Sequence, residues 1–183
     1  VYISGTGTFQ SVQETTRPYW IKPSWVNATQ MDKAFIRARD LIRAWLDAPP
    51  EPGQAPRQQG FPPVIIHITD GEDNGVYDPE PLTYEIRSEG TQQGATLIFN
   101  CHFTANMHDP CIFPAREYEV SHLNPFAAKL LAMSSIIPEP LLLNAGEVTG
   151  QPLQPGARGF IYNSNAEILV KFLNFGTLGT GAA

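Results

Sequence analysis

The apolar positions along the chain follow two spacings, one typical of helices and one typical of buried strands. From Met31 onward, apolar side chains recur at intervals of three and four residues, at Met31, Ala34, Phe35, Ala38, Leu41, Ile42, Trp45 and Leu46. This stripe predicts an amphipathic helix with charged residues, Asp32 among them, over much of its remaining surface. The helix should end before Pro49 and Pro50, because a residue that precedes proline is disfavoured in helical conformation.

Continuous apolar runs indicate strands between the helices. Residues 64–68 read VIIHI and are apolar on both faces, as in a buried parallel strand. Residues 95–103 and 159–162 have the same character. Further helices are expected over residues 81–93, 126–134 and 168–175, the last with Asn163 and Asn165 as candidate caps. Helices that alternate with buried strands predict an α/β fold with a mostly parallel sheet.

Composition and charge narrow the class of partner. The 183 residues are 42% hydrophobic and 16% charged, which suits one globular domain with a real core. The net charge is −6 and the basic residues are scattered, so we expect neither nucleic acid nor an anionic membrane as partner. No apolar stretch is long enough to cross a bilayer and no signal peptide is evident, so we expect a cytoplasmic location.

The tripeptide Thr69-Asp70-Gly71 follows the apolar run 64–68, where open α/β sheets bind ligands. Asp70 would supply a hard oxygen ligand suited to Mg²⁺, and Gly71 would let the chain turn sharply. The alternative is an ordinary turn, since Asp and Gly are common in turns. Thr29 stands at the start of the long helix, where it either caps that helix or brings its hydroxyl near the same ion.

These features occur in an order that resembles the metal-ion-dependent adhesion site of von Willebrand factor A (VWA) domains. The order is Thr29, Met31, a helix, a Pro-rich loop, an apolar strand and Thr69-Asp70-Gly71. Four later segments are similar to a bacterial branch of the family, namely TLIFNCH (96–102), MSSIIPEP (133–140), GARGFIYN (156–163) and FLNFGT (172–177). The resemblance implies a Rossmann-like three-layer sandwich that binds protein and is not an enzyme.

The resemblance also implies the site. Thr29 and Asp70 would hold Mg²⁺, with Mn²⁺ or Ca²⁺ as alternatives, and the metal would accept a carboxylate from a partner protein. The loops around it would contact that partner through four further residues, Asn27, Gly71, Glu72 and Asp73.

One part of the family pattern is missing from the sequence. No Asp-x-Ser-x-Ser segment occurs, although in the family it follows the first strand and supplies metal ligands. Residues 1–5 resemble the third, edge strand, so we expect one VWA-like domain over residues 1–183 that lacks its first two strands and first helix, on the order of thirty residues or more. Residues 64–68 should then form an edge that is unpaired or paired by another chain, and metal affinity should be poor.

Two other functions stay open on the sequence. A metal-assisted α/β hydrolase could use Asp70, Glu72 and Asp73, although no base or nucleophile is identifiable. The chain could also be a remnant with an incomplete metal site that no longer binds.

Histidines and cysteines suggest further sites. Cys101, His102, His108 and Cys111 invite a zinc interpretation, but their spacing matches no standard structural zinc pattern. Adjacent residues of a strand point to opposite faces, so Cys101 and His102 should not bind the same metal ion. Cys101 is expected to be a buried free thiol. His67 is expected to be a hydrogen-bonded core histidine.

Overall fold

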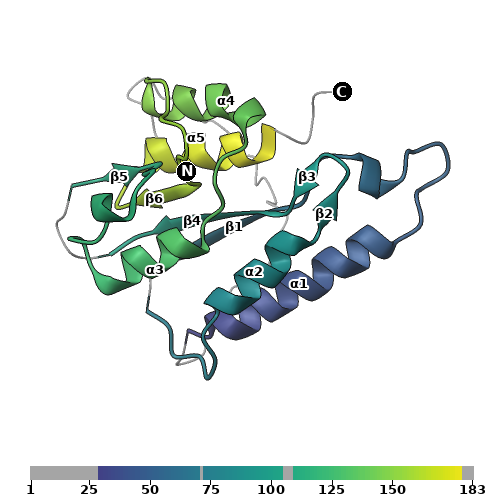
Figure 1. The fold of residues 1–183 in the computed structure, drawn as a ribbon, viewed down its shortest axis with the longest axis horizontal. Coiled ribbons are helices and arrows are strands. Elements are labelled where there is room, and N and C mark those ends of the chain that lie inside the picture. The colour runs from purple at the N-terminus through teal and green to yellow at the C-terminus, as the bar shows by residue number, and fades with distance from the viewer. Residues whose placement is uncertain (1–28, 71, 105–108, 179–183) are drawn as a thin grey trace, which may run out of the picture.

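The computed structural model describes residues 29–70, 72–104 and 109–178 as a three-layer α/β arrangement (Figure 1). A four-stranded sheet has the order β1-β4-β6-β5. Its strands are β1 (Val64–Thr69), β4 (Leu97–His102), β6 (Phe160–Tyr162) and β5 (Cys111–Ile112). The helices are α1 (Met31–Asp47), α2 (Glu80–Ser88), α3 (Pro125–Met133), α4 (Glu139–Thr149) and α5 (Ala166–Leu178).

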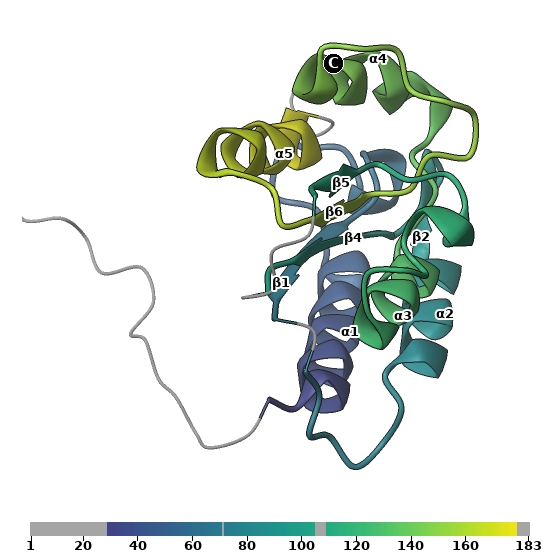
Figure 2. The ribbon, with the colours of Figure 1, turned by 90° about the vertical axis from the view of Figure 1, so that its left-hand side faces the viewer.

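The helices cover both faces of the sheet, with α1, α2 and α3 on one side and α4 and α5 on the other (Figure 2). Phe35 of α1 and Leu130 of α3 belong to the core on the first side. Phe172 and Phe175 of α5 belong to the core on the second side, where both pack against Phe99 of β4. The α/β class and the mostly parallel sheet expected from the sequence are therefore confirmed.

Strands β1 and β4 differ in burial although they pair along their whole length. They run parallel in a register that joins Val64 to Leu97 and Thr69 to His102. All six residues of β4 are buried, whereas those of β1 are partly exposed and Ile68 is 52% exposed. Among the described residues β4 is the one strand beside β1, so β1 lies at the edge of the described sheet.

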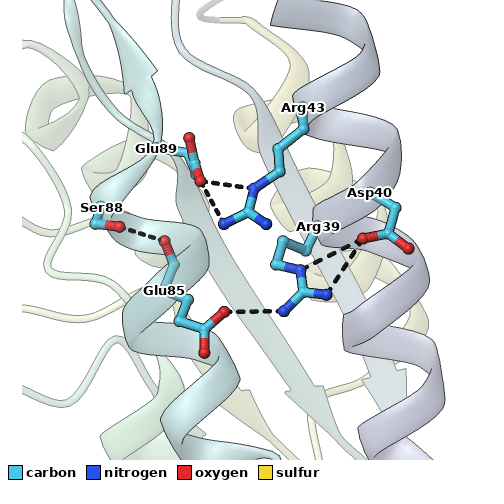
Figure 3. Close-up of polar contacts among 6 residues, drawn as sticks. All are labelled: Arg39, Asp40, Arg43, Glu85, Ser88 and Glu89. Atoms are coloured by element: carbon cyan, nitrogen blue, oxygen red, sulfur yellow. Dashed lines mark hydrogen bonds and ion pairs between the residues drawn. The ribbon is translucent and has the colours of Figure 1, made fainter.

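Helices α1 and α2 are joined on their outer surface by two ion pairs one helical turn apart (Figure 3). Arg39 Nη1 lies 2.9 Å from Glu85 Oε2, and Arg43 Nη2 lies 2.8 Å from Glu89 Oε1. These side chains are substantially exposed, so water screens the pairs and they orient the two helices more than they stabilise them.

Several predicted boundaries are confirmed and others are wrong. Helix α1, the three main strands and α3 lie within a few residues of their predicted positions, and Asn165 Oδ1 accepts a hydrogen bond from Ile168 N at the start of α5. The helix expected over 81–93 ends at Ser88, because the chain turns there into a short hairpin of β2 (Gly90–Thr91) and β3 (Gly94–Ala95). Helix α4 was not predicted. The strand expected near residue 1 lies outside the described residues.

Two short 3₁₀ helices complete the described structure, η1 (Arg57–Gln59) and η2 (Glu117–Glu119). Of the helices in the described ranges, none is both long and apolar enough to cross a bilayer.

Candidate functional site

The predicted metal-binding aspartate lies at the carboxyl end of β1 and is exposed. Asp70 Oδ1 accepts a hydrogen bond from Glu72 N at 3.2 Å, which folds the loop back on itself. The Asp70 carbonyl oxygen lies 2.8 Å from His102 Nε2, at the end of neighbouring β4. The backbone of this residue is therefore held by the sheet, while its carboxylate stays at the surface.

The segment that carries Thr29 lies beside the Asp70 loop, as the sequence predicts. Asn74 N donates to Thr29 O at 2.7 Å, and Thr29 N donates to Asn74 Oδ1 at 3.4 Å. Helix α1 has Gln30 as its N-cap residue, so Thr29 stands one residue before the cap, and α1 has no side-chain cap from Gln30. The Thr29 side chain is exposed.

The capping group of α1 comes instead from Asp73. Asp73 Oδ1 accepts hydrogen bonds from Met31 N at 3.0 Å and from Gly75 N at 2.9 Å. A carboxylate at this position satisfies an otherwise unpaired helix N–H and meets the positive end of the helix dipole. Asp73 was predicted as a partner-binding residue, and the structure places it in an internal structural role that sequence reasoning missed.

Asp32 is a second acidic residue whose role differs from the prediction. The sequence pattern placed it on the exposed side of α1, but it is 2% exposed, and its Oδ2 accepts a hydrogen bond from Tyr77 N at 3.3 Å. Gly75 packs closely against it, since a Cβ at Gly75 would lie 2.6 Å from Asp32 Oδ1. Asp32 and Asp73 thus hold the loop after Asp70 against the start of α1.

The remaining predicted loop residues are less informative. Glu72 is exposed, and Asn27 and Gly71 lie outside the described residues. Within the described part of the chain, no three or more His, Cys, Asp or Glu side chains gather into a group that could hold a metal ion.

A buried polar chain lies behind the loop. Asn100 Nδ2 donates to Leu130 O at 3.1 Å and to Ser134 Oγ at 2.8 Å. Its Oδ1, 2.9 Å from His67 Nδ1, is therefore assigned as the acceptor of the His67 N–H. His67 is the hydrogen-bonded histidine expected, and burial lowers its pKa, so the ring is held neutral. Burial also lowers the pKa of His102.

The cysteines are free thiols, and Cys101 is buried as expected. Burial raises the pKa of Cys101 to about 12, and burial with the nearby Glu119 carboxylate raises that of Cys111 to about 11. Neither sulfur is thus an activated nucleophile. His108, which the zinc interpretation needs, lies outside the described residues.

The two predicted ligands carry oxygen donors of the kind that divalent cations bind. Asp70 offers a carboxylate and Thr29 a hydroxyl, both hard ligands of the kind Mg²⁺ and Ca²⁺ take, and Mg²⁺ commonly keeps several waters beside one or two carboxylates. Asp73 does not fit as a third ligand through Oδ1, because that oxygen already accepts two backbone hydrogen bonds. No family model, curated protein or solved structure matches the chain.

Proposed function

We propose that this chain is a protein-binding module that receives a carboxylate of its partner through a divalent cation at Asp70 and Thr29. The observation that carries the proposal is that the acidic residues around the loop differ in exposure and in hydrogen-bond partners. Asp73 bonds to the backbone and Asp32 is buried, whereas Asp70, on a segment hydrogen-bonded to that of Thr29, stays exposed. The VWA resemblance assigns the ligand role to these same two residues.

In this proposal, neighbouring residues hold the two proposed metal ligands in place. The sheet and His102 hold the Asp70 backbone, and the Asn74 contacts hold Thr29 against the loop that follows Asp70. When bound, Mg²⁺ would supply an open coordination position with affinity for a carboxylate oxygen. Charge-assisted contact of this kind gives specificity more than affinity, so a partner also needs apolar contact area.

The neighbouring loop offers such area. Val76 is 76% exposed and Tyr77 is 69% exposed, and both line a hollow of about 270 Å³ between the loop and α3. Exposed apolar and aromatic side chains of this kind are common anchors of protein interfaces. This loop belongs to the region that the sequence predicts as a partner-binding surface.

Calorimetric titration of the full chain with MgCl₂ tests the metal part of the proposal. We expect saturable binding with a Kd on the order of millimolar, as for weakly built oxygen sites. Asp70→Ala should abolish it and Thr29→Ala should weaken it, whereas the matched control Asp47→Ala, an exposed aspartate at the other end of α1, should not change it. Absence of binding to the unmodified chain would favour the non-binding alternative.

The partner part needs a separate measurement. An immobilised chain should retain a partner in Mg²⁺ and release it in EDTA, and the Asp70→Ala variant should not retain it in either. Retention that is unchanged in both comparisons would overturn the proposal even if the chain binds Mg²⁺.

A further inference from the structure

A second candidate site lies at the opposite end of the sheet, where β1 and β4 begin. A groove of about 400 Å³ opens there between the start of β4, the segment after α3 and the start of α4. This volume falls in the usual range for small-ligand sites. Most of the groove wall is apolar and includes Phe61, Leu97, Ile136, Pro138 and Leu141.

Two arginines line this apolar groove together. Arg158 Nη1 donates to Ser134 O at 2.8 Å, and Arg87 Nη1 approaches the same carbonyl oxygen at 3.4 Å. Two positive charges are therefore held close together by one neutral acceptor. Burial and the charge of Arg158 both lower the pKa of Arg87, with burial the larger cause.

Neither arginine forms an ion pair among the described residues, although the Glu80 carboxylate acts on Arg87 from a longer distance and opposes the lowering of its pKa by burial. The Arg87 guanidinium also lies 4.7 Å from the centre of the Tyr84 ring. The ion pairs of the described residues involve Arg39, Arg43, Lys129 and Lys171, and none includes Arg87 or Arg158. Glu139 stands between two prolines of the groove wall, but it forms no ion pair with either arginine. A partly buried guanidinium that forms no ion pair is costly, so arginines in such places are usually paired.

Hydrogen-bonding capacity beside the groove is also unused. Within the described residues, Arg87 Nη2 and Thr96 Oγ1 are buried without a hydrogen-bond partner, and Thr96 is fully buried. Most buried polar groups in proteins have a partner, so two orphans that line one groove point to a group that binds there.

The chemistry of the wall selects the kind of anion. Planar guanidinium groups match the two oxygens of a carboxylate, and the apolar wall matches a hydrocarbon body. Guanidinium groups also bind phosphate, but a small inorganic anion would leave the apolar wall of Leu97, Ile136 and Leu141 without contacts. The groove therefore favours an apolar carboxylic acid over an inorganic anion.

We propose that this groove binds a small organic monocarboxylate, with the carboxylate on Arg87 and Arg158 and the apolar body against Leu97, Ile136 and Leu141. The site is independent of the proposed cation at Asp70, because it lies at the amino ends of the strands and the cation site lies at their carboxyl ends. Loss of one should leave the other unchanged.

Titration of the full chain with sodium octanoate, followed by ¹⁵N NMR and calorimetry, tests the proposal. We expect saturable binding, with shifts concentrated at residues 94–97 and 134–141. Octanamide has the same hydrocarbon body without the charge, and its affinity should be at least about tenfold lower than that of octanoate. Inorganic phosphate should also bind more weakly than octanoate. Equal binding of octanoate and octanamide, or stronger binding of phosphate, would overturn the proposal.

Two variants locate the site. Arg158→Gln should weaken octanoate binding about tenfold or more, whereas Arg43→Gln, which removes an arginine from the α1–α2 surface, should leave binding unchanged. Because Arg158 also holds Ser134 O, Ile136→Asp is a second variant that places a negative charge on a side chain that is 54% exposed. It should fold normally and weaken octanoate binding.

Octanoate binding that is unchanged in both variants would overturn the assignment. So would a result in which a peptide with an apolar C-terminal residue binds through its free carboxylate while octanoate does not, because the groove would then belong to a protein ligand.

Discussion

The two ends of the sheet carry opposite charges, and they differ in how those charges are used. At the carboxyl ends of the strands, Asp32 and Asp73 accept backbone hydrogen bonds and shape the loop, and Asp70 stays exposed. At the amino ends, Arg87 and Arg158 share one carbonyl oxygen and form no ion pair among the described residues. The hydrogen-bond and ion-pair partners of a charged residue thus distinguish a structural role from a ligand-binding role.

This distinction is invisible in the net charge of −6, which sums over both ends. It leads to a simple expectation. Changes to the acidic end should cost stability, and changes to the arginines at the basic end should cost little stability and mainly affect binding. Four measurements test that expectation.

The largest effect is expected for Gly75→Ala at the acidic end. The new methyl group would lie 2.6 Å from Asp32 Oδ1 and 3.0 Å from Asp73 Oδ1, and Asp32 is too buried to move aside. We expect a loss of about 3 kcal/mol in the free energy of unfolding, measured by urea denaturation. Gly60→Ala is the control, because its methyl group would meet only Arg57 O at 3.4 Å. A Gly75→Ala loss no larger than that of the control would contradict the close packing described here.

Asp73→Ala should have the next largest effect. It removes the acceptor for Met31 N and Gly75 N, so the start of α1 loses its cap. We expect a loss of about 2 kcal/mol, and hydrogen exchange should speed up in the first turn of α1. Glu72→Ala, beside it in the exposed part of the loop, should be nearly neutral. Similar losses for the two variants would mean that Asp73 has no special structural role.

Acidification should destabilise the fold through His67, which lies within β1. Burial lowers the pKa of His67 below its ordinary value of 6.5, so the unfolded chain binds a proton at His67 more readily than the folded chain does. Stability is then highest above pH 6.5 and falls as the pH drops below it toward the lowered folded pKa, by up to about 1.4 kcal/mol per pH unit. Denaturation midpoints between pH 7.5 and 5.5 measure this slope.

His67→Gln supplies the comparison for that slope. It should reduce the pH dependence, leaving the share of His102, whose pKa is also lowered by burial. An unchanged slope would show that His67 is protonated equally in the folded and unfolded chain.

The smallest effect is expected for Arg87→Met at the basic end. Methionine keeps much of the apolar stem and removes a half-buried charge that forms no ion pair among the described residues, at the loss of hydrogen bonds to Thr83 O and Ser134 O. These effects oppose each other, so the free energy of unfolding should change by less than about 1 kcal/mol. Thermal and urea denaturation measure it. A loss of unfolding free energy as large as that of Asp73→Ala would show that Arg87 has a structural role. The two ends of the sheet would then not differ in the way described.

Much of the fold was predictable because apolar residues recur at different spacings in helices and strands. The stripe from Met31 and the run at residues 64–68 located α1 and β1, although Leu41, Trp45 and Ile68 of these segments are exposed. Helix α4 was missed although Leu141, Ala145 and Val148 are buried at helical spacing, because two prolines and a glycine surround and interrupt a short segment. The end of α2 was misplaced because the hairpin after Ser88 depends on contacts between Gly90 and Ala95.

The candidate sites were predictable to a lesser degree. A side chain at the end of a strand has a foreseeable location, so Asp70 could be placed at the carboxyl end of β1 from the sequence. The segment of Thr29 is hydrogen-bonded to the loop after Asp70. The partners of Asp73 and Asp32 lie across a loop, and the pairing of Arg87 with Arg158 joins residues far apart in the chain. Such contacts arise from tertiary packing and leave no local pattern.

The hydrogen bond between His67 and Asn100 has a consequence for how the chain folds. In the native register these two residues stand opposite each other on β1 and β4. A slip of one residue would turn the His67 side chain to the other face and leave the buried Asn100 amide oxygen without its donor, at a cost of about 1–3 kcal/mol. It would also shift Asp70 by about 3 Å from His102. Parallel strands pair slowly during folding. The hydrogen bond between His67 and Asn100 therefore favours the native register over a misaligned one.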